Sequence, residues 1–107
     1  MNAGRVLVRP QAEDEIDEIA RYIALRNLDA GKAFYDAIEN ALKLLAEHPG
    51  VGALRQVKNP KLHGLRSWPL TGYRNYLVFY LPLPSGGVEV LHVLHGARSF
   101  GELLERG

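Results

Sequence analysis

Apolar residues recur at helical spacing in the first half of the chain. Between residues 10 and 26 they share one face of a helix, at Ala12, Ile16, Ile19, Ala20 and Ile23. Pro10 suits the first turn of a helix, where its missing backbone N–H would have no partner anyway. The acidic residues of the first turns lie where the helix dipole favours negative charge, and we interpret them as solvated surface. The pattern predicts a helix over residues 10–26.

A second amphipathic stretch follows almost at once. Asn27 is a good N-cap, and Pro49-Gly50 should end the helix near His48. The apolar positions between these limits again form one stripe, at Ala30, Phe34, Ala37, Ile38, Ala41, Leu44 and Leu45. Two such helices joined by so short a connection predict an antiparallel helical hairpin.

β-branched and aromatic residues predict strands on both sides of these helices. Residues 5–9 form a short first strand. Residues 65–70 form another, which Pro69 restricts to a sheet edge or an irregular strand. Residues 73–81 and 88–95 are the strongest strand candidates, and the turn residues between them predict a β-hairpin.

The remaining segments complete one domain. Residues 51–64 are polar, basic and loop-like, and residues 99–106 can form a short helix. The element order is β-α-α-β-β-β, and 107 residues fit a single domain over residues 1–107. We therefore predict an α+β fold, with the helical hairpin packed on one face of a mostly antiparallel sheet. The opposite face of the sheet is expected to be open.

Composition excludes several classes of protein and site. Apolar residues make up 47% of the chain and charged residues 23%, which is typical of a folded globular domain. The absence of cysteine excludes disulfides, thiolate metal sites and cysteine nucleophiles. No metal-ligand spacing with partner carboxylates joins the four histidines, His48, His63, His92 and His95. We expect neither a metal site nor a cofactor. No apolar run has the length of a signal peptide or a membrane span, so we expect a cytoplasmic protein.

Charge is distributed unevenly between the two halves. Residues 1–50 carry six basic and nine acidic residues, a net charge of −3, whereas residues 51–107 carry seven and three, a net charge of +4. This asymmetry indicates either an anionic partner for the basic half or a domain whose acids lie on its helices. The basic residues expected on the open face and its rim are Arg55, Lys58, Lys61, Arg66, Arg74 and Arg98.

Several short motifs follow one another in a familiar order along nearly the whole chain. They are Arg9-Pro10 and Tyr22-Ile23-Ala24 around the first helix, Ala33-Phe34, Leu44-Leu45 and Glu47-His48-Pro49-Gly50-Val51-Gly52 in and after the second, and Gly64-Leu65-Arg66, Tyr73-Arg74, Val78-Phe79-Tyr80, Val93-Leu94-His95 and Arg98 in the strand region. In their order and spacing the chain resembles the ParE branch of the ParE/RelE toxin superfamily. The resemblance implies the toxin of a type II toxin–antitoxin system, neutralised by a small antitoxin whose flexible carboxy-terminal segment wraps the toxin. It also implies one of two targets: ParE-like toxins poison DNA gyrase, and RelE-like toxins cut messenger RNA in the ribosomal A site.

The two targets require different chemistry. RNA cleavage by the neighbouring 2′-hydroxyl needs a base, cations near the phosphate and an acid for the leaving oxygen. By the resemblance, Arg66 and Arg98 stand at the places of the ribonuclease arginines, and His95 could shuttle a proton. After Arg98, however, the chain contains no Tyr, His or Lys, so the usual carboxy-terminal acid or base is missing. We therefore expect a gyrase inhibitor that acts by binding and catalyses nothing.

Two other interpretations are a ribosome-dependent endoribonuclease that uses Arg66, His95 and Arg98, and a relative that has lost toxicity and only binds. A partner antitoxin is expected in all three cases. The candidate residues for binding the target or the antitoxin are Arg66, Arg74, His92, His95 and Arg98. Of these, His92 points to the open face if Leu91 and Val93 pack under the helices. The toxin interpretation depends on that bare basic face, and burial of the face by the chain's own segments, or a sheet built in another order, would overturn it.

Overall fold

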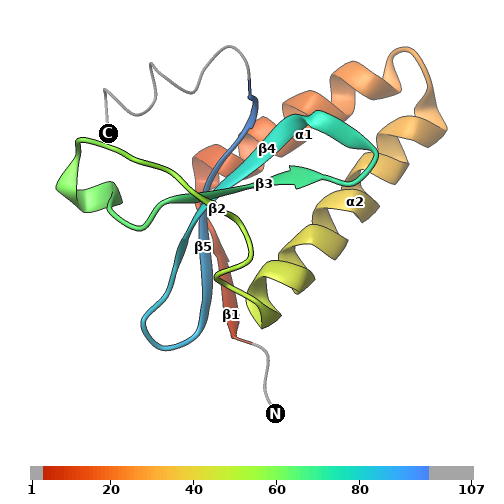
Figure 1. Ribbon diagram of the computed structural model, residues 1–107. Coiled ribbons are helices and arrows are strands. Elements are labelled where there is room, and N and C mark those ends of the chain that lie inside the picture. Colours follow the sequence, from red (N-terminus) through yellow and green to blue (C-terminus); the bar gives the residue numbers. More distant parts are fainter. Residues whose placement is uncertain (1–3, 97–107) are drawn as a thin grey trace.

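Two helices pack on one face of a five-stranded sheet in the computed structural model, which describes residues 4–96 (Figure 1). The elements are β1 (Arg5–Val8), α1 (Pro10–Ala24), α2 (Leu28–Glu47), β2 (Ala53–Leu54), the 3-10 helix η1 (Pro60–Leu62), β3 (Arg66–Leu70), β4 (Tyr73–Pro82) and β5 (Gly87–His95). The predicted α+β fold and the order of the long elements are confirmed. The short helix expected over residues 99–106 lies outside the described residues.

The first strand joins the sheet beside the last one. The strand order is β1-β5-β4-β3-β2, and β1 is parallel to β5 while the other neighbours are antiparallel. Arg5 faces Gly87 at the start of the parallel pair. Gly87 has a φ of +85°, and a Cβ there would overlap the backbone of Arg5. Only glycine therefore fits this close approach of the two strands.

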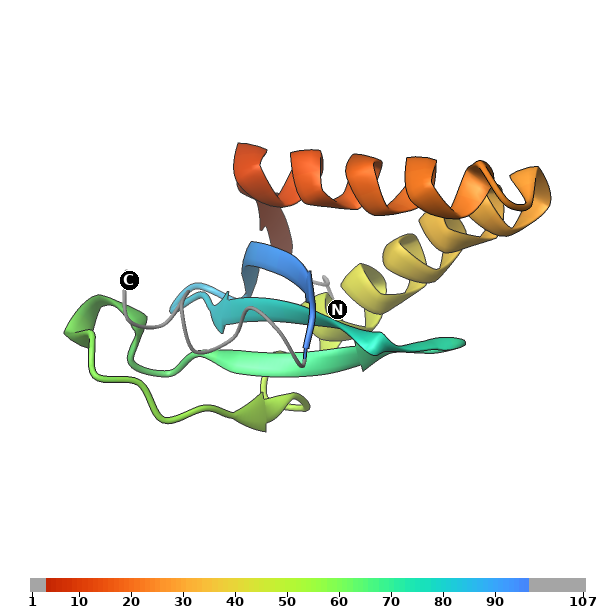
Figure 2. The ribbon, with the colours of Figure 1, turned by 90° about the horizontal axis from the view of Figure 1, so that it is seen from above.

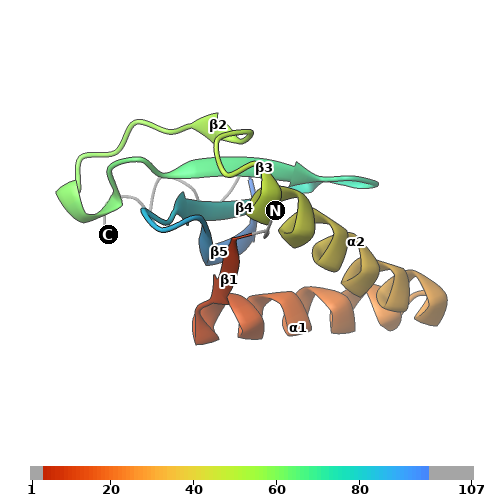
Figure 3. The same ribbon diagram turned by 90° about the horizontal axis from the view of Figure 1, so that it is seen from below.

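The helical hairpin follows from its capping residues. Pro10 stands in the first turn of α1, and the side chain of Asn27 accepts a hydrogen bond from the Ala30 N–H at 3.1 Å at the start of α2. α1 ends at Ala24, two residues before the predicted end at residue 26. The helices meet at this connection and spread apart toward the sheet (Figures 1 and 3).

The main core lies between the helices and the sheet. Phe34 and Leu45 of α2 and Tyr80 of β4 are among its fully buried side chains. The rings of Tyr73 and Tyr76 meet Phe34 edge-on, with centroid distances of 5.2 and 6.0 Å. Burial of each such side chain stabilises the fold by about 1.5–3 kcal/mol, so these contacts fix the helices on the sheet.

The opposite face of the sheet is not open, contrary to our expectation. The segment of residues 55–65 folds over it, and buried Leu62 and Leu65 pack there with Phe79 and Leu91. In Figures 2 and 3, β2, which leads into this segment, lies on the side of the sheet away from α1. Leu62 stands in a polar, basic stretch that has no periodic signal, which is why residues 51–64 are predicted to be a loop. Leu65, predicted to begin the next strand, lies one residue before β3. The inference of a bare basic face is therefore wrong, and the toxin interpretation loses this support.

A β-bulge in β5 decides which of its residues share a face. Phe79 faces His92, but the next residue, Tyr80, faces Val90, so Leu91 is an extra residue in the ladder. Leu91 joins the cluster around Phe79, so the condition set for His92, that Leu91 and Val93 both pack under the helices, does not hold for Leu91. Val93 does pack under the helices. His92, paired with Phe79, lies on the face away from the helices, but this face is not the open one that was expected.

Candidate partner-binding site

Among residues 4–96, no strand neighbours the outer edge of β5 beyond the end of β1. The β1–β5 pairing stops at Val8 and Val90, and the Arg9 N–H then donates to the Val90 carbonyl at 3.1 Å. Pro10 starts α1 immediately afterwards, so the chain leaves the sheet at this point. β5 continues to His95 and is paired there with β4. Within the described residues, positions 91–95 therefore have a strand partner on one side only.

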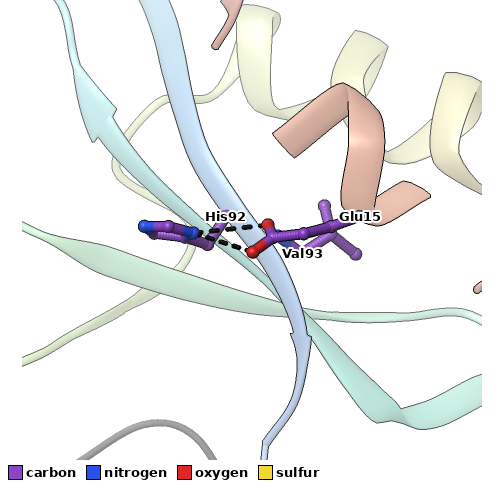
Figure 4. A network of polar contacts seen from close by, with 3 residues as sticks. All are labelled: Glu15, His92 and Val93. Atoms are coloured by element: carbon purple, nitrogen blue, oxygen red, sulfur yellow. Dashed lines mark hydrogen bonds and ion pairs between the residues drawn. The ribbon is translucent and has the colours of Figure 1, made fainter. Parts of the chain in front are cut away.

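A carboxylate of α1 occupies this edge. Glu15 accepts a hydrogen bond from the backbone N–H of Val93 at 3.0 Å, and its other oxygen lies 3.0 Å from Nδ1 of His92 (Figure 4). The side chains of Glu15 and His92 are only 17% and 12% exposed. A hydrogen bond to a charged group contributes about 1.5–3 kcal/mol, so Glu15 ties α1 to the edge of β5.

Sequence reasoning missed Glu15, which was interpreted as one of the solvated acids of the first helical turns. The signal that could have found it is its spacing. Glu15 lies three residues after Ala12 and four before Ile19, which places it on the margin of the same apolar face. A carboxylate at such a position loses water on folding and needs a hydrogen-bond donor in return. The Val93 N–H is that donor.

A groove of about 490 Å³ adjoins this edge, between α1 and the ends of β4 and β5. Its walls are formed by Glu15, Glu18, Ile19 and Tyr22 on α1 and by Tyr76, Val93, Leu94 and His95 on the two strands. Tyr22 is 51% exposed and offers apolar contact surface, while the two glutamates supply negative charge. The guanidinium of Arg26 lies 5.0 Å from the centroid of the Tyr22 ring, so acidic, basic and aromatic groups all border the groove.

The two candidate histidines lie on different faces of the sheet. His92 is held by Glu15 on the face away from the helices. His95 faces Tyr76 at the end of β5, where it is exposed and its ring meets that of Tyr76 edge-on at 5.7 Å. Of the two, only His95 lines the groove.

Arg66 serves the turn that ends α2. Its guanidinium donates to the carbonyls of Gly52 at 2.7 Å and Gly50 at 3.1 Å. The buried hydroxyl of Tyr80 completes the arrangement, because it accepts from the Gly52 N–H and donates to the Pro49 carbonyl, both at 2.8 Å. Burial raises the pKa of Tyr80, and this outweighs the opposing effects of the Gly52 N–H and the Arg66 charge. These contacts give Arg66 a structural role in the turn.

The ribonuclease residues do not converge within the described part of the chain. Arg66 faces Tyr80 and His95 faces Tyr76, four positions earlier on β4. At about 3.4 Å per residue and about 4.8 Å per strand, the Cα atoms of Arg66 and His95 are roughly 17 Å apart. Arg74 lies on β4, although its side chain is not described, and Arg98 lies outside the described residues. The separation counts against joint action of Arg66 and His95 on one phosphate.

Three of the seven basic residues of the second half lie on the segment of residues 55–65. Lys58 and Lys61 are exposed there, and Arg55 donates through Nε to Ser67 Oγ at 2.7 Å.

Among residues 4–96, no three His, Asp or Glu side chains gather where they could hold a metal ion. In the same range, neither helix combines the length and the apolar character that crossing a membrane requires.

The comparisons with known proteins agree with this fold. No curated protein matches the sequence. Among solved structures, a chain of the "Chromosomal ParDE TA system from P. aeruginosa" is similar, with a TM-score of 0.66 and 18% identity over 87% of this chain and 96% of that chain. The profile of the family described as "ParE toxin of type II toxin-antitoxin system, parDE" matches residues 6–100, almost the whole chain. This chain therefore belongs to the ParE toxin family of type II toxin–antitoxin systems.

Proposed function

We propose that this chain inhibits DNA gyrase by binding to it, and that a cognate antitoxin neutralises the inhibition. The family match over residues 6–100 carries the proposal, because gyrase is the target that the resemblance to the ParE branch implies. Inhibition of gyrase would block replication and would take place in the cytoplasm.

Action by binding, without catalysis, is supported by the arrangement of the polar side chains. General acid–base chemistry needs its proton donors and acceptors within hydrogen-bond reach of one reacting group. Arg66 instead binds the carbonyls of the turn after α2, and His95 stands at the far end of β5. Gyrase inhibition requires only a complementary surface, which a fold of this size can provide.

A supercoiling assay tests the proposal directly. Purified chain is added to gyrase, relaxed plasmid and ATP, and the products are separated by gel electrophoresis. Loss of supercoiled plasmid or accumulation of cleaved DNA is expected. The same chain mixed beforehand with its antitoxin serves as the control and should leave gyrase active. Full supercoiling activity at saturating toxin would refute the proposal.

Primer extension on translating messages tests the ribonuclease alternative. Induction of the chain should produce no new 5′ ends if gyrase is the target. New 5′ ends that disappear with His95→Ala would instead identify a ribosome-dependent nuclease, and the gyrase proposal would fail.

A further inference from the structure

We infer that the segment of residues 55–65, which covers the sheet on the side away from the helices, binds the phosphate backbone of the DNA on which gyrase acts. The inference rests on the proposed function for the source of that DNA. It adds a second ligand, duplex DNA, and assigns the surface of the chain that binds it.

Acidic and basic side chains belong to different layers of the fold. Nine of the ten acidic residues between positions 4 and 96 lie on α1 and α2. The tenth, Glu89 on β5, is paired with Arg9 at 2.9 Å. Residues 48–88, by contrast, carry five basic residues and no acid. The helical layer is therefore acidic and the opposite side of the molecule basic, an arrangement that orients a small protein toward a polyanion.

The segment of residues 55–65 has a defined shape. Buried Leu62 and Leu65 anchor it to the sheet. The Arg55 N–H donates to the Leu65 carbonyl at 2.8 Å and so joins the two ends of the segment. Between these ends, the Asn59 side chain caps η1 by accepting a hydrogen bond from the Lys61 N–H at 3.0 Å. The outer side chains therefore start from a fixed backbone, which lowers the entropic cost of binding.

The outer surface of the segment carries groups that can donate hydrogen bonds to phosphate. Gln56, Lys58, Lys61 and His63 are all exposed. Among residues 4–96, neither lysine forms an ion pair with a carboxylate. Lysine and glutamine are among the side chains that proteins use to contact the DNA backbone. The two lysine charges can thus replace counterions on DNA phosphates.

Duplex DNA fits this surface better than an acidic protein segment does. The leucines of the segment, Leu62 and Leu65, are buried against the sheet. Its exposed residues are polar apart from Pro60 and Gly64. The surface therefore offers charge and hydrogen-bond donors but little apolar contact. Binding to phosphates needs no apolar burial, whereas a protein interface usually has an apolar core.

Fluorescence anisotropy of a labelled DNA duplex, titrated with the full-length chain at several salt concentrations, tests the inference. Each neutralised phosphate contributes about −0.9 to the slope of log K against log salt concentration. Lys58→Gln combined with Lys61→Gln should therefore lower the affinity about tenfold at low salt and reduce the steepness of this slope by about 2.

A second double variant is the matched control. Lys32→Gln combined with Lys43→Gln removes the same charge from exposed positions of α2, in the acidic layer. Because charges farther apart than the Debye length are screened, this control should leave the affinity for the duplex within about twofold and the slope unchanged. Equal effects of the two double variants, or no binding of the duplex at low salt, would overturn the inference.

Binding of the chain to gyrase with and without DNA connects this surface with the proposed target. If the segment contacts gyrase-bound DNA, the DNA should raise the affinity of the unmodified chain for gyrase at least about tenfold, since two surfaces are then engaged at once. The variant at Lys58 and Lys61 should bind DNA-free gyrase normally and lose this increase. An affinity of the unmodified chain that is the same with and without DNA would refute the inference.

The outcomes separate this inference from the proposed function. If the chain inhibits gyrase but the variant at Lys58 and Lys61 inhibits it equally well, the inference is wrong and the proposed function stands. If the duplex binds through the two lysines but gyrase stays fully active, the proposed function is wrong, and the assignment to gyrase-bound DNA is overturned with it. Binding of polyglutamate in place of the duplex, with the same dependence on the two lysines, would assign the surface to an acidic protein and also overturn the inference.

Discussion

Replacing Tyr80 by Phe removes one hydroxyl group that serves two backbone groups. The ring is fully buried between the helices and the sheet, so Phe fills the same space. The hydroxyl, however, accepts from the Gly52 N–H and donates to the Pro49 carbonyl, both at 2.8 Å. Tyr80→Phe therefore isolates the contribution of these two hydrogen bonds to the turn after α2.

The structure sets the size of the effect. A hydrogen bond contributes about 0.5–1.5 kcal/mol net, and a buried group left without its partner costs about 1–3 kcal/mol. With two backbone groups affected, we expect Tyr80→Phe to lower the free energy of unfolding by about 3 kcal/mol. For a domain of this size, that corresponds to a fall in Tm of roughly 10–20 °C.

Urea unfolding followed by circular dichroism measures this loss, because the midpoint and slope give the free energy of unfolding. Tyr35→Phe is the matched control. It removes the same atom from a tyrosine that is 46% exposed and donates to Asp17 at 2.7 Å. We expect the control to change the free energy by less than about 0.5 kcal/mol, because water replaces the lost bond. Equal losses in the two variants would refute the assignment of the turn's stability to Tyr80.

Three further predictions concern the same turn. Gly52→Ala should lower the free energy of unfolding by about 1–3 kcal/mol, because a Cβ would lie 2.5 Å from the Tyr80 hydroxyl. Gly50→Ala is the control and should leave this free energy unchanged, because its Cβ would have no atom within 4 Å. The Tm values of the two variants test the prediction. Arg66→Ala should cost about 1–2 kcal/mol in urea unfolding, since it removes donors to two carbonyls, whereas unchanged stability with lost gyrase inhibition would show that Arg66 contacts the target. Burial raises the pKa of Tyr80 above its ordinary 10.0, so the folded state holds the hydroxyl proton more tightly than the unfolded state does. The free energy of unfolding should therefore fall as the pH rises above about 10. Tyr80→Phe, which removes the titrating hydroxyl, should reduce that fall.

The helices and long strands could be predicted because local residues determine them. Pro10 and Asn27 mark the helix starts, and the apolar stripes between them and Pro49 each need another element to pack against, which the predicted strands supply. Trp68 and Pro69 illustrate the same point in β3, where the register shifts next to the proline as expected for an irregular strand.

The features that were missed depend on contacts between distant segments. β2 has only two residues, and its partner, β3, begins after residue 65. The role of Glu15 exists only because β5 brings the Val93 N–H to α1 across 78 positions of sequence. An acid in the first helical turns is also favoured by the helix dipole alone. The sequence of the helix therefore gives no reason to expect a tertiary contact of Glu15.

The parallel pairing of β1 with β5 delays completion of the fold during synthesis. The helical hairpin can form while later residues are still inside the ribosome, because its contacts are local. Arg5, by contrast, must wait for Gly87 before β1 has a partner. During translation the apolar face of the hairpin consequently cannot be fully covered until the last strand emerges, and exposed apolar surface of this kind is prone to aggregation.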